Sequence, residues 1–482
     1  MTTRLVEGPG TPSDDLCYLT AVEAIKRFKR KELSPVELIE AVIRQAENAN
    51  PKVNAYTETF YERALKQARE AEGKYARGED VRPLEGISCA IKDLHDVKGE
   101  VVTRGSRAYE GVRAESTLPT VERLLDAGAI MLALSAAPEF GHAGHCHSPL
   151  WGITRNPWNL DYSSGGSSGG AAVAVAAGMT TIADGGDGGG SVRVPASACG
   201  VFGYKPPFGR NPTGLIRHNL ETILHLGPIT RSVADAALMQ NVMSGCHPTD
   251  IMTLREKVEL PMMFEDIRGW KVAFSPDLDY FEVDSEVAAN TAAAVDAFRE
   301  LGCTVDQVEL GWNYSVLDAW MTHWEALFAA DAGDLLSRWQ YEMDPFLRGV
   351  LHRGMQHSAV REMRTALVRT EMYKTLGPVL EEYDILVCPT LAVPSVRADH
   401  RNDDPDFRIN GKRVDAYVQW LLTYPFNLVS QCPVASVPTG FATSGVPTGM
   451  QIIARSFDDL RVFRAAAAFE AIRPWSATVP AL

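Results

Sequence analysis

Two serines flanked by glycines, Ser167 and Ser191, have the surroundings in this sequence that best suit covalent chemistry. They lie on either side of an apolar, alanine-rich run, residues 171–179. Three consecutive glycines, residues 188–190, precede Ser191, and glycine permits backbone angles that turn successive N–H groups toward one point. Such groups can hold a developing oxyanion beside a hydroxyl nucleophile. A flexible linker is the alternative for a Gly/Ser-rich stretch, but a linker does not enclose an apolar run.

A serine hydroxyl needs a base, and histidine is the usual one. Three of the eleven histidines cluster as His142, His145 and His147, which also raises the possibility of a metal site. Their spacing matches no common zinc signature, and Gly144 between them indicates a loop. We expect these histidines to lie at a pocket rim or to be structural, and we predict no metal.

Lys92 is the better candidate for the base. It ends an apolar run, residues 87–91, that is typical of a buried strand. Burial disfavours the ammonium form and lowers the pKa of a lysine, so that a neutral amine can accept a proton near neutral pH. The alternative is a surface lysine paired with Asp93. Position alone favours that alternative, and only the combination with the two serines favours a base.

Four motifs in a fixed order resemble the signature of the amidase signature family of serine hydrolases. The matching segments are Gly165–Gly170 (GGSSGG), Gly185–Pro195 (GGDGGGSVRVP), Cys199–Pro206 (CGVFGYKP) and, upstream, Ile87–Asp93 (ISCAIKD). The resemblance extends from about residue 20 to about residue 470.

The resemblance implies an α/β fold with a large mixed sheet of about eleven strands, covered by helices on both faces. Matched residue by residue, it implies a Ser-Ser-Lys triad, with Ser191 as nucleophile, Lys92 as base, and Ser167, after a cis peptide bond, as proton relay. The implied oxyanion hole consists of the N–H groups of Gly188, Gly189, Gly190 and Ser191. No organic cofactor or metal is implied.

Other residues of these motifs are expected to support the site. Asp187 and Arg193 flank the nucleophile and are predicted to form an ion pair that fixes the glycine loop, and Ser168 is a further supporting residue. A rival interpretation takes residues 165–169 as the GxSxG elbow of an α/β-hydrolase. That fold gives no role to Ser191 or Lys92.

Composition sets limits on partners and location. A net charge of −14 argues against nucleic-acid binding, which needs clustered Lys and Arg. Eight cysteines without a CxxC pair indicate reduced thiols. The first residues lack the pattern of a secretory signal, and no apolar run approaches the roughly 20 residues that span a bilayer. We expect a cytoplasmic monomer or homodimer without a membrane anchor.

The chain divides into a predicted N-terminal helical arm, residues 1–75, and a catalytic domain, residues 76–482. A helix begins after Ser34 and is expected to end near Asn48, with helix again through Ala71. Short apolar runs alternating with helical patterns then indicate a sheet covered by helices. Residues 310–383 break this alternation and form a predicted helical cap with four tryptophans, which either pack as core or line a substrate pocket.

Two departures from the family pattern bear on the substrate. The loop before Ser191 is unusually rich in glycine, and residues 134–140 lack the Lys and Asn that are frequent in the family. We therefore predict hydrolysis of amide-type C–N bonds (amide, anilide or carbamate) through an acyl-enzyme, with apolar or aryl substrates favoured, as in aryl amidases, nylon-oligomer hydrolases and urethanase-like members. The alternatives are the amidase subunit of an aminoacyl-tRNA amidotransferase, against which the acidity counts, and a catalytically silent binding protein.

Overall fold

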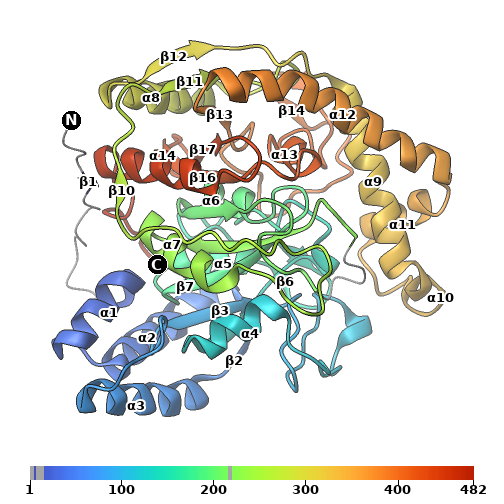
Figure 1. The fold of residues 1–482 in the computed structure, drawn as a ribbon. Helices are drawn as coiled ribbons and strands as arrows, with labels where there is room; N and C mark the ends of the chain where they lie inside the picture. The colour runs from blue at the N-terminus through green and yellow to red at the C-terminus, as the bar shows by residue number, and fades with distance from the viewer. Residues whose placement is uncertain (1–4, 7–15, 215–219) are drawn as a thin grey trace.

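A mixed sheet of 11 strands runs through the molecule (Figure 1), for which a computed structural model describes residues 5–6, 16–214 and 220–482. Neighbouring strands pair in both directions: β3 lies parallel to β4 and β7, whereas β7 and β9 are antiparallel. The predicted fold class is therefore confirmed. In spatial order the strands are β12 (Thr304–Gln307), β11 (Lys271–Phe274), β13 (Ile385–Pro389), β17 (Pro447–Ile453), β16 (Val434–Phe441), β8 (Phe202–Lys205), β9 (His225–Thr230), β7 (Ile182–Asp187), β3 (Ser88–Lys92), β4 (Ile130–Ser135) and β2 (Tyr56–Thr59).

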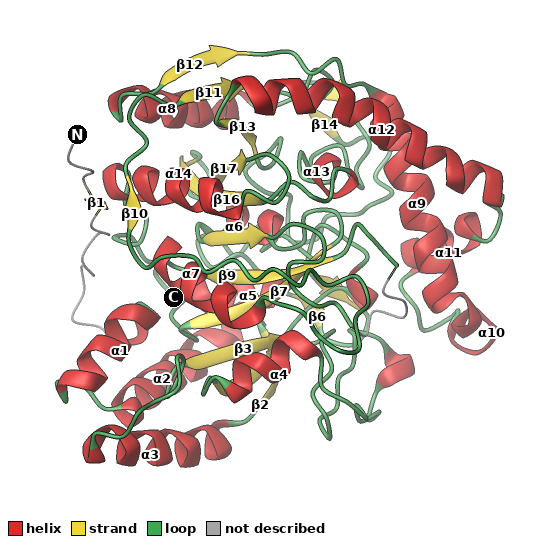
Figure 2. Cartoon of the chain, in the orientation of Figure 1, coloured by secondary structure: helices red, strands yellow, loops and turns green. Residues whose placement is uncertain are grey.

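Helices cover both faces of the sheet (Figure 2). Along β3, Cys89 and Ile91 pack into one apolar cluster and Ala90 into another, as the two-residue period of a strand requires. Lys92 therefore points to the same face as Ala90, which is the face that α5 covers. The helices between or after the strands include α4 (Pro119–Asp126), α5 (Gly169–Ala176), α6 (Arg193–Cys199), α7 (Val233–Met243), α8 (Ser285–Glu300), α13 (Pro425–Leu428) and, after the last strand, α14 (Asp459–Ile472).

The N-terminal segment contains α1 (Ala21–Arg30), α2 (Pro35–Val53) and α3 (Tyr61–Arg77). The predicted start of α2 is confirmed, because Ser34 and Glu37 form a capping box. The predicted end near Asn48 is wrong, since α2 continues through Pro51, which lies in its last turn. The segment after it is not wholly helical either: β2 pairs with β4 as an edge strand of the main sheet, so tertiary pairing overrides the local pattern.

Residues 310–383 form a layer of helices at one end of the sheet, seen at the right and top of Figure 1. The helix α9 packs against α11 and α12. Trp312, Trp320 and Trp324 are buried in the apolar cluster that has the most members among the described residues. The helices of this layer are α9 (Tyr314–Ala332), α10 (Leu336–Trp339), α11 (Pro345–Gly354) and α12 (Ala359–Glu382).

Short elements complete the fold. Among the described residues, no helix is both long and apolar enough to cross a bilayer. The cysteines, all of which lie in the described part of the chain, form no disulfide, and all except Cys246 are buried. The remaining strands form three pairs: β1 (Leu5–Val6) with β10 (Phe264–Glu265), β5 (His147–Ser148) with β6 (Gly152–Ile153), and β14 (Arg408–Ile409) with β15 (Lys412–Arg413). The 3-10 helices are η1 (Leu16–Tyr18), η2 (Arg107–Tyr109), η3 (Glu139–Gly141) and η4 (Gly333–Leu335).

Candidate active site

Ser167 lies in a tight loop just before α5, and the peptide bond between Gly166 and Ser167 is cis. The helix that follows is buried on all sides, because its alanine, glycine and valine side chains are small enough to pack directly on the sheet. A Cβ on Gly170 would lie 2.4 Å from the backbone of Ala136, so only glycine permits this approach. The loop is not a linker. The residues directly before Ser167 form no strand, which excludes the α/β-hydrolase elbow.

Lys92 is buried at the end of β3 and contacts Ser167. Its Nζ donates to Ser167 Oγ at 2.7 Å, and only 1% of the residue is exposed. Burial lowers the pKa of Lys92 to about 8, and the nearby Asp184 carboxylate opposes this shift. The alternative of a surface lysine paired with Asp93 is wrong, because the Asp93 carboxylate accepts hydrogen bonds from Thr103 instead.

Asp184, which the sequence analysis missed, holds this strand end in place. One carboxylate oxygen accepts from the Lys92 backbone N–H at 2.8 Å, and the other lies 2.5 Å from His95 Nδ1. Asp184 is on β7 next to β3, so the parallel pairing of these strands brings it there. The only signal in the sequence was a charged residue inside a run that is otherwise typical of a buried strand.

Ser168 connects the two serine loops. Its backbone N–H donates to the carbonyl of Ser191 at 3.2 Å. Its hydroxyl accepts from the Gly186 N–H at 3.3 Å. The loop of Ser167 and the loop of Ser191 are therefore bonded directly to each other.

Asp187 and Arg193 form the predicted ion pair, with Arg193 Nη2 2.8 Å and Nε 3.0 Å from the carboxylate. Burial alone would raise the pKa of Asp187, but Arg193 and further donors hold that pKa well below its usual range. Asp187 also accepts from the Gly190 N–H at 2.9 Å and from the Val192 N–H at 3.2 Å. The glycine loop is thus wrapped around one buried carboxylate.

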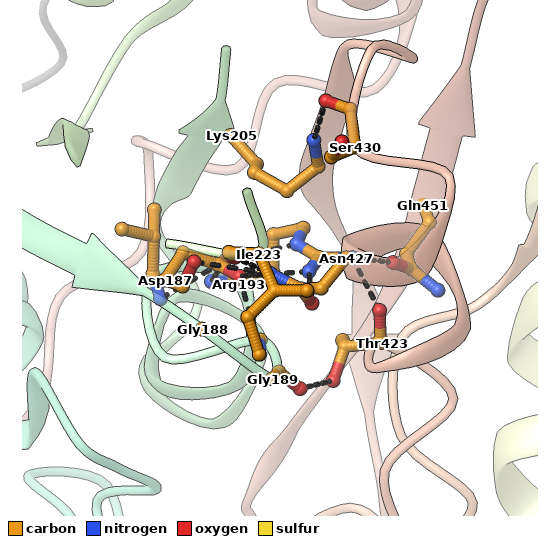
Figure 3. A network of polar contacts seen from close by, with 12 residues as sticks. Asp187, Gly188, Gly189, Arg193, Lys205, Ile223, Thr423, Asn427, Ser430 and Gln451 are labelled. Carbon is orange, nitrogen blue, oxygen red and sulfur yellow. Dashed lines mark hydrogen bonds and ion pairs between the residues drawn. The ribbon is translucent and has the colours of Figure 1, made fainter. Parts of the chain in front are cut away.

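Residues from the C-terminal part of the chain complete this network (Figure 3). Arg193 donates to Gln451 Oε1 at 2.6 Å and to Asn427 Oδ1 at 2.8 Å. Asn427 Nδ2 in turn donates to Asp187 Oδ1 at 2.8 Å, and Thr423 Oγ1 donates to the Gly189 carbonyl at 2.6 Å. Residues far away in the chain therefore fix the loop that carries Ser191.

The glycines before Ser191 are explained by this packing. Gly190 has φ +124°, and a Cβ there would lie 1.9 Å from Thr423 Oγ1. A Cβ on Gly189 would lie 2.6 Å from Trp320. The structure also corrects one expectation: the Gly190 N–H donates to Asp187, so it is already used within the loop. Of the four predicted oxyanion donors, the N–H groups of Gly188, Gly189 and Ser191 remain.

Two cavities meet at Ser191. The larger one has a volume of about 130 Å³, and Lys92, Ser167 and Ser191 all line it. Its apolar walls are Leu94, Leu118, Phe140, Leu224, Trp324, Leu327 and Phe328, and its polar walls include His95, Asp96, Arg104 and His225. The smaller cavity has a volume of about 10 Å³ and shares Ser191 and Trp324 with the larger one.

Three of the four tryptophans of residues 310–383 divide between the two expected roles, whereas Trp339 is half-buried and lines neither cavity. Trp312 is buried, and its Nε1 donates to Thr375 Oγ1 within the helical layer. Trp324 lines both cavities, and Trp320 lines the smaller one. The neighbouring Leu327 also lines the larger cavity. Sequence alone could not make this division, because it depends on which turn of α9 faces Ser191.

The histidine loop lies beside the smaller cavity. His142 lines this cavity, and its Nδ1 is 2.9 Å from the Glu139 carbonyl. Burial lowers the pKa of His145 well below its usual range, so that this ring is neutral. Within the described part of the chain, no three His, Cys, Asp or Glu side chains are gathered as metal ligands would be.

Comparisons with known proteins agree with this geometry. The family model described as Amidase matches residues 37–463. An acylamidase from Rhodococcus erythropolis is 37% identical over 97% of this chain and 98% of its own. The crystal structure of a bacterial aryl acylamidase of the amidase signature family matches with a TM-score of 0.89 and 31% identity, covering 96% of this chain and 99% of that one. A glutamyl-tRNA(Gln) amidotransferase subunit from Geobacter metallireducens is 30% identical over 96% of this chain and 98% of its own.

The chain therefore belongs to the amidase signature family, as the four motifs indicate. It is an enzyme, an amide hydrolase.

Proposed function

We propose that this enzyme hydrolyses its substrate through a covalent acyl-enzyme on Ser191, with Ser167 and Lys92 as the proton relay. The observation that carries this proposal is the buried contact of 2.7 Å between Lys92 Nζ and Ser167 Oγ, on the wall of the cavity that Ser191 also lines. The lowered pKa of Lys92, about 8, supports a neutral amine that can accept a proton.

The proposed reaction takes two steps. Ser191 Oγ attacks the carbonyl carbon and gives its proton to Ser167, whose own proton passes to Lys92. The proton then returns through Ser167 to the departing nitrogen as the C–N bond breaks, leaving an ester on Ser191. Water, deprotonated by the same relay, attacks the ester and releases the acid.

The N–H groups of Gly188, Gly189 and Ser191 would stabilise the oxyanion in both steps. Gly190 contributes differently: because its N–H donates to Asp187, it sets the path of the loop. Arg193 and Asn427 hold that carboxylate in turn. The roles of Ser168, Asp187 and Arg193 are thus to position the loop.

The proposed substrates carry an apolar or aryl group on the scissile bond. Leu224, Trp324, Leu327 and Phe328 give the larger cavity a mainly apolar wall. Carbamates and esters share the same tetrahedral chemistry and belong to the proposed range. The names of the related acylamidase and aryl acylamidase support amides with an aryl or acyl portion.

We further propose that residues 76–482 form one catalytic domain, that residues 310–383 are its cap over the substrate pocket, and that residues 1–75 are an N-terminal arm. The chain would act in the cytoplasm as a monomer or homodimer, without nucleic acid. The position of Trp324 and Leu327 on the cavity wall supports the cap.

The direct test is hydrolysis of acetanilide and of a phenylcarbamate by the wild type and by Ser191→Ala. The variant should keep its circular dichroism spectrum and lose turnover, because it lacks the oxygen that forms the ester. Turnover by Ser191→Ala close to that of the wild type would refute the assignment.

A second candidate role is that of the amidase component in a tRNA-dependent amidotransferase, favoured by 30% identity to such a component over 96% of the chain. A component of that kind works with a partner protein, so the test is co-purification. Full anilide hydrolysis by the isolated chain would argue against this role.

A further inference from the structure

Ser191 lies between the two cavities, and the cavities differ in the residues that line them. Lys92 and Ser167, the proposed proton relay, line the larger cavity. The smaller cavity lies against Gly189 and Gly190, on the side of the glycine loop. Of the described side chains, those of Ser191 and Trp324 line both.

The chemistry of the proposed function assigns a direction to each part of the substrate. The tetrahedral carbon carries four groups: Ser191 Oγ, the oxyanion, the departing nitrogen and the acyl chain. The nitrogen must receive its proton from Ser167, so it has to face the larger cavity. The water that later attacks the ester needs the same relay and enters from the same side. The oxyanion lies against the N–H groups of Gly188, which lines the larger cavity, of Gly189, which lines the smaller one, and of Ser191, which lines both, and therefore sits where the cavities meet. The acyl chain is left to extend past the oxyanion toward the smaller cavity.

We propose that the smaller cavity is an acyl-chain pocket that restricts the enzyme to short acyl groups, while the larger cavity takes the amine portion. This proposal rests on the proposed function. The volume of about 10 Å³ open in the smaller cavity is that needed for one water molecule, which is similar in size to a methyl group. Its walls include Ala143, Val194, Trp320, Val418 and Leu421, which suit a hydrocarbon chain.

The walls of this pocket are tied together, so a longer chain cannot easily push them apart. Tyr417 OH donates to the His142 carbonyl at 2.6 Å and accepts from Trp324 Nε1 at 2.8 Å. Trp320 Nε1 donates to the Gly188 carbonyl at 3.3 Å. Leu421 packs closely on Gly144: a Cβ added to Gly144 would lie only 2.9 Å from Leu421 Cδ1. Packing and hydrogen bonds therefore hold these walls in place.

A matched pair of leucine variants separates the two cavities. Leu421, 5% exposed, lines only the smaller cavity, and Leu327, 8% exposed, lines only the larger one. We would measure kcat/KM for the p-nitroanilides of acetic, butyric and hexanoic acid with the wild type, Leu421→Ala and Leu327→Ala. A second series would keep the acetyl group and vary the amine from butylamine to aniline to naphthylamine.

The wild type should prefer acetyl to butyryl by at least about tenfold, the discrimination expected when extra methylenes do not fit an apolar pocket. Leu421→Ala should reduce this ratio at least about tenfold, since it adds room for the chain. Leu327→Ala should change the amine series and leave the acetyl-to-butyryl ratio within about twofold. Each ratio compares kcat/KM for two substrates measured with the same enzyme sample. A partial loss of folded protein lowers both values equally and leaves the ratio unchanged.

If Leu327→Ala rather than Leu421→Ala relaxed the acyl preference, the two cavities would have the reverse roles and the proposal would be overturned. An unchanged ratio in both variants would overturn it as well. Should Leu421→Ala fail to fold, Val418→Ala opens the same pocket. Failure of the proposed function looks different: the wild type would hydrolyse no anilide, or Ser191→Ala would remain active.

Discussion

The pH dependence of catalysis tests the role of Lys92 quantitatively. Burial sets the pKa of Lys92 at about 8, against an ordinary value of 10.5. Only the neutral amine can accept a proton, so kcat/KM should follow the neutral fraction. With a pKa of about 8, that fraction rises from roughly 9% at pH 7 to roughly 91% at pH 9, about tenfold, and then levels off. With an unperturbed lysine the same interval would give about a hundredfold rise with no plateau.

The assay is kcat/KM for one anilide between pH 6.5 and 10, with the ratio of the values at pH 9 and pH 7 as the readout. Lys205 is a matched control, because it is also fully buried and burial lowers its pKa to about 7, yet it bonds backbone carbonyls and not Ser167. The Lys205→Met variant should keep the rise of kcat/KM centred near pH 8. The Lys92→Ala variant should lose this rise together with most of the activity. The reasoning would be refuted if kcat/KM of the wild type rose a hundredfold between pH 7 and pH 9 or did not change with pH. It would also be refuted if Lys205→Met lost the pH-dependent rise while Lys92→Ala kept it.

Three further predictions follow from the same structure. Asp187→Asn leaves the Arg193 guanidinium buried without its carboxylate, so the free energy of unfolding in urea should fall by about 3–5 kcal/mol; a loss below about 1 kcal/mol would contradict the network. Acetanilide should exceed acetamide in kcat/KM by at least about tenfold, and Trp324→Ala should narrow this gap, because burial of an aryl group on that wall is favourable. Equal values for the two amides would show that the wall does not contact the substrate. Of eight cysteines only Cys246 is exposed, so an aromatic disulfide reagent should titrate one thiol rapidly in the native protein and eight after denaturation; several fast thiols in the native protein would be inconsistent with this packing.

Local patterns in the sequence were enough to predict the strand that carries Lys92 and the motifs around both serines. The apolar run that ends at Lys92 is β3, and the Lys92 side chain at its end faces the side that α5 covers. The Asp187–Arg193 pair was predictable because the two partners flank one short loop. The edge strand β2 was not, since its sequence, Tyr-Thr-Glu-Thr, is short and mostly polar and gains its structure only from pairing with β4.

The parts of the site that sequence could not supply come from distant segments. Asn427 contacts Asp187 across 240 positions of the chain. Trp320 and Trp324 reach the glycine loop from α9 and explain why side chains are missing there. The hydrogen bond from the Gly190 N–H to Asp187 could not be predicted from the sequence either, because it depends on the path of the folded loop. The contacts of Asn427, Trp320 and Trp324 are tertiary ones, with no signal at the spacing of a helix or a strand, whereas the contact between Gly190 and Asp187 is local and depends on the conformation of the loop.

The central claim is that Ser191 forms the covalent intermediate, and labelling with a fluorophosphonate tests it most directly. Intact-mass and peptide analysis of the treated wild type should show one adduct, on the peptide that contains Ser191. Ser191→Ala should take up no label although it is folded, and Lys92→Ala should be labelled much more slowly because the relay lacks its base. An adduct on another residue, or labelling of Ser191→Ala at the rate of the wild type, would contradict the account.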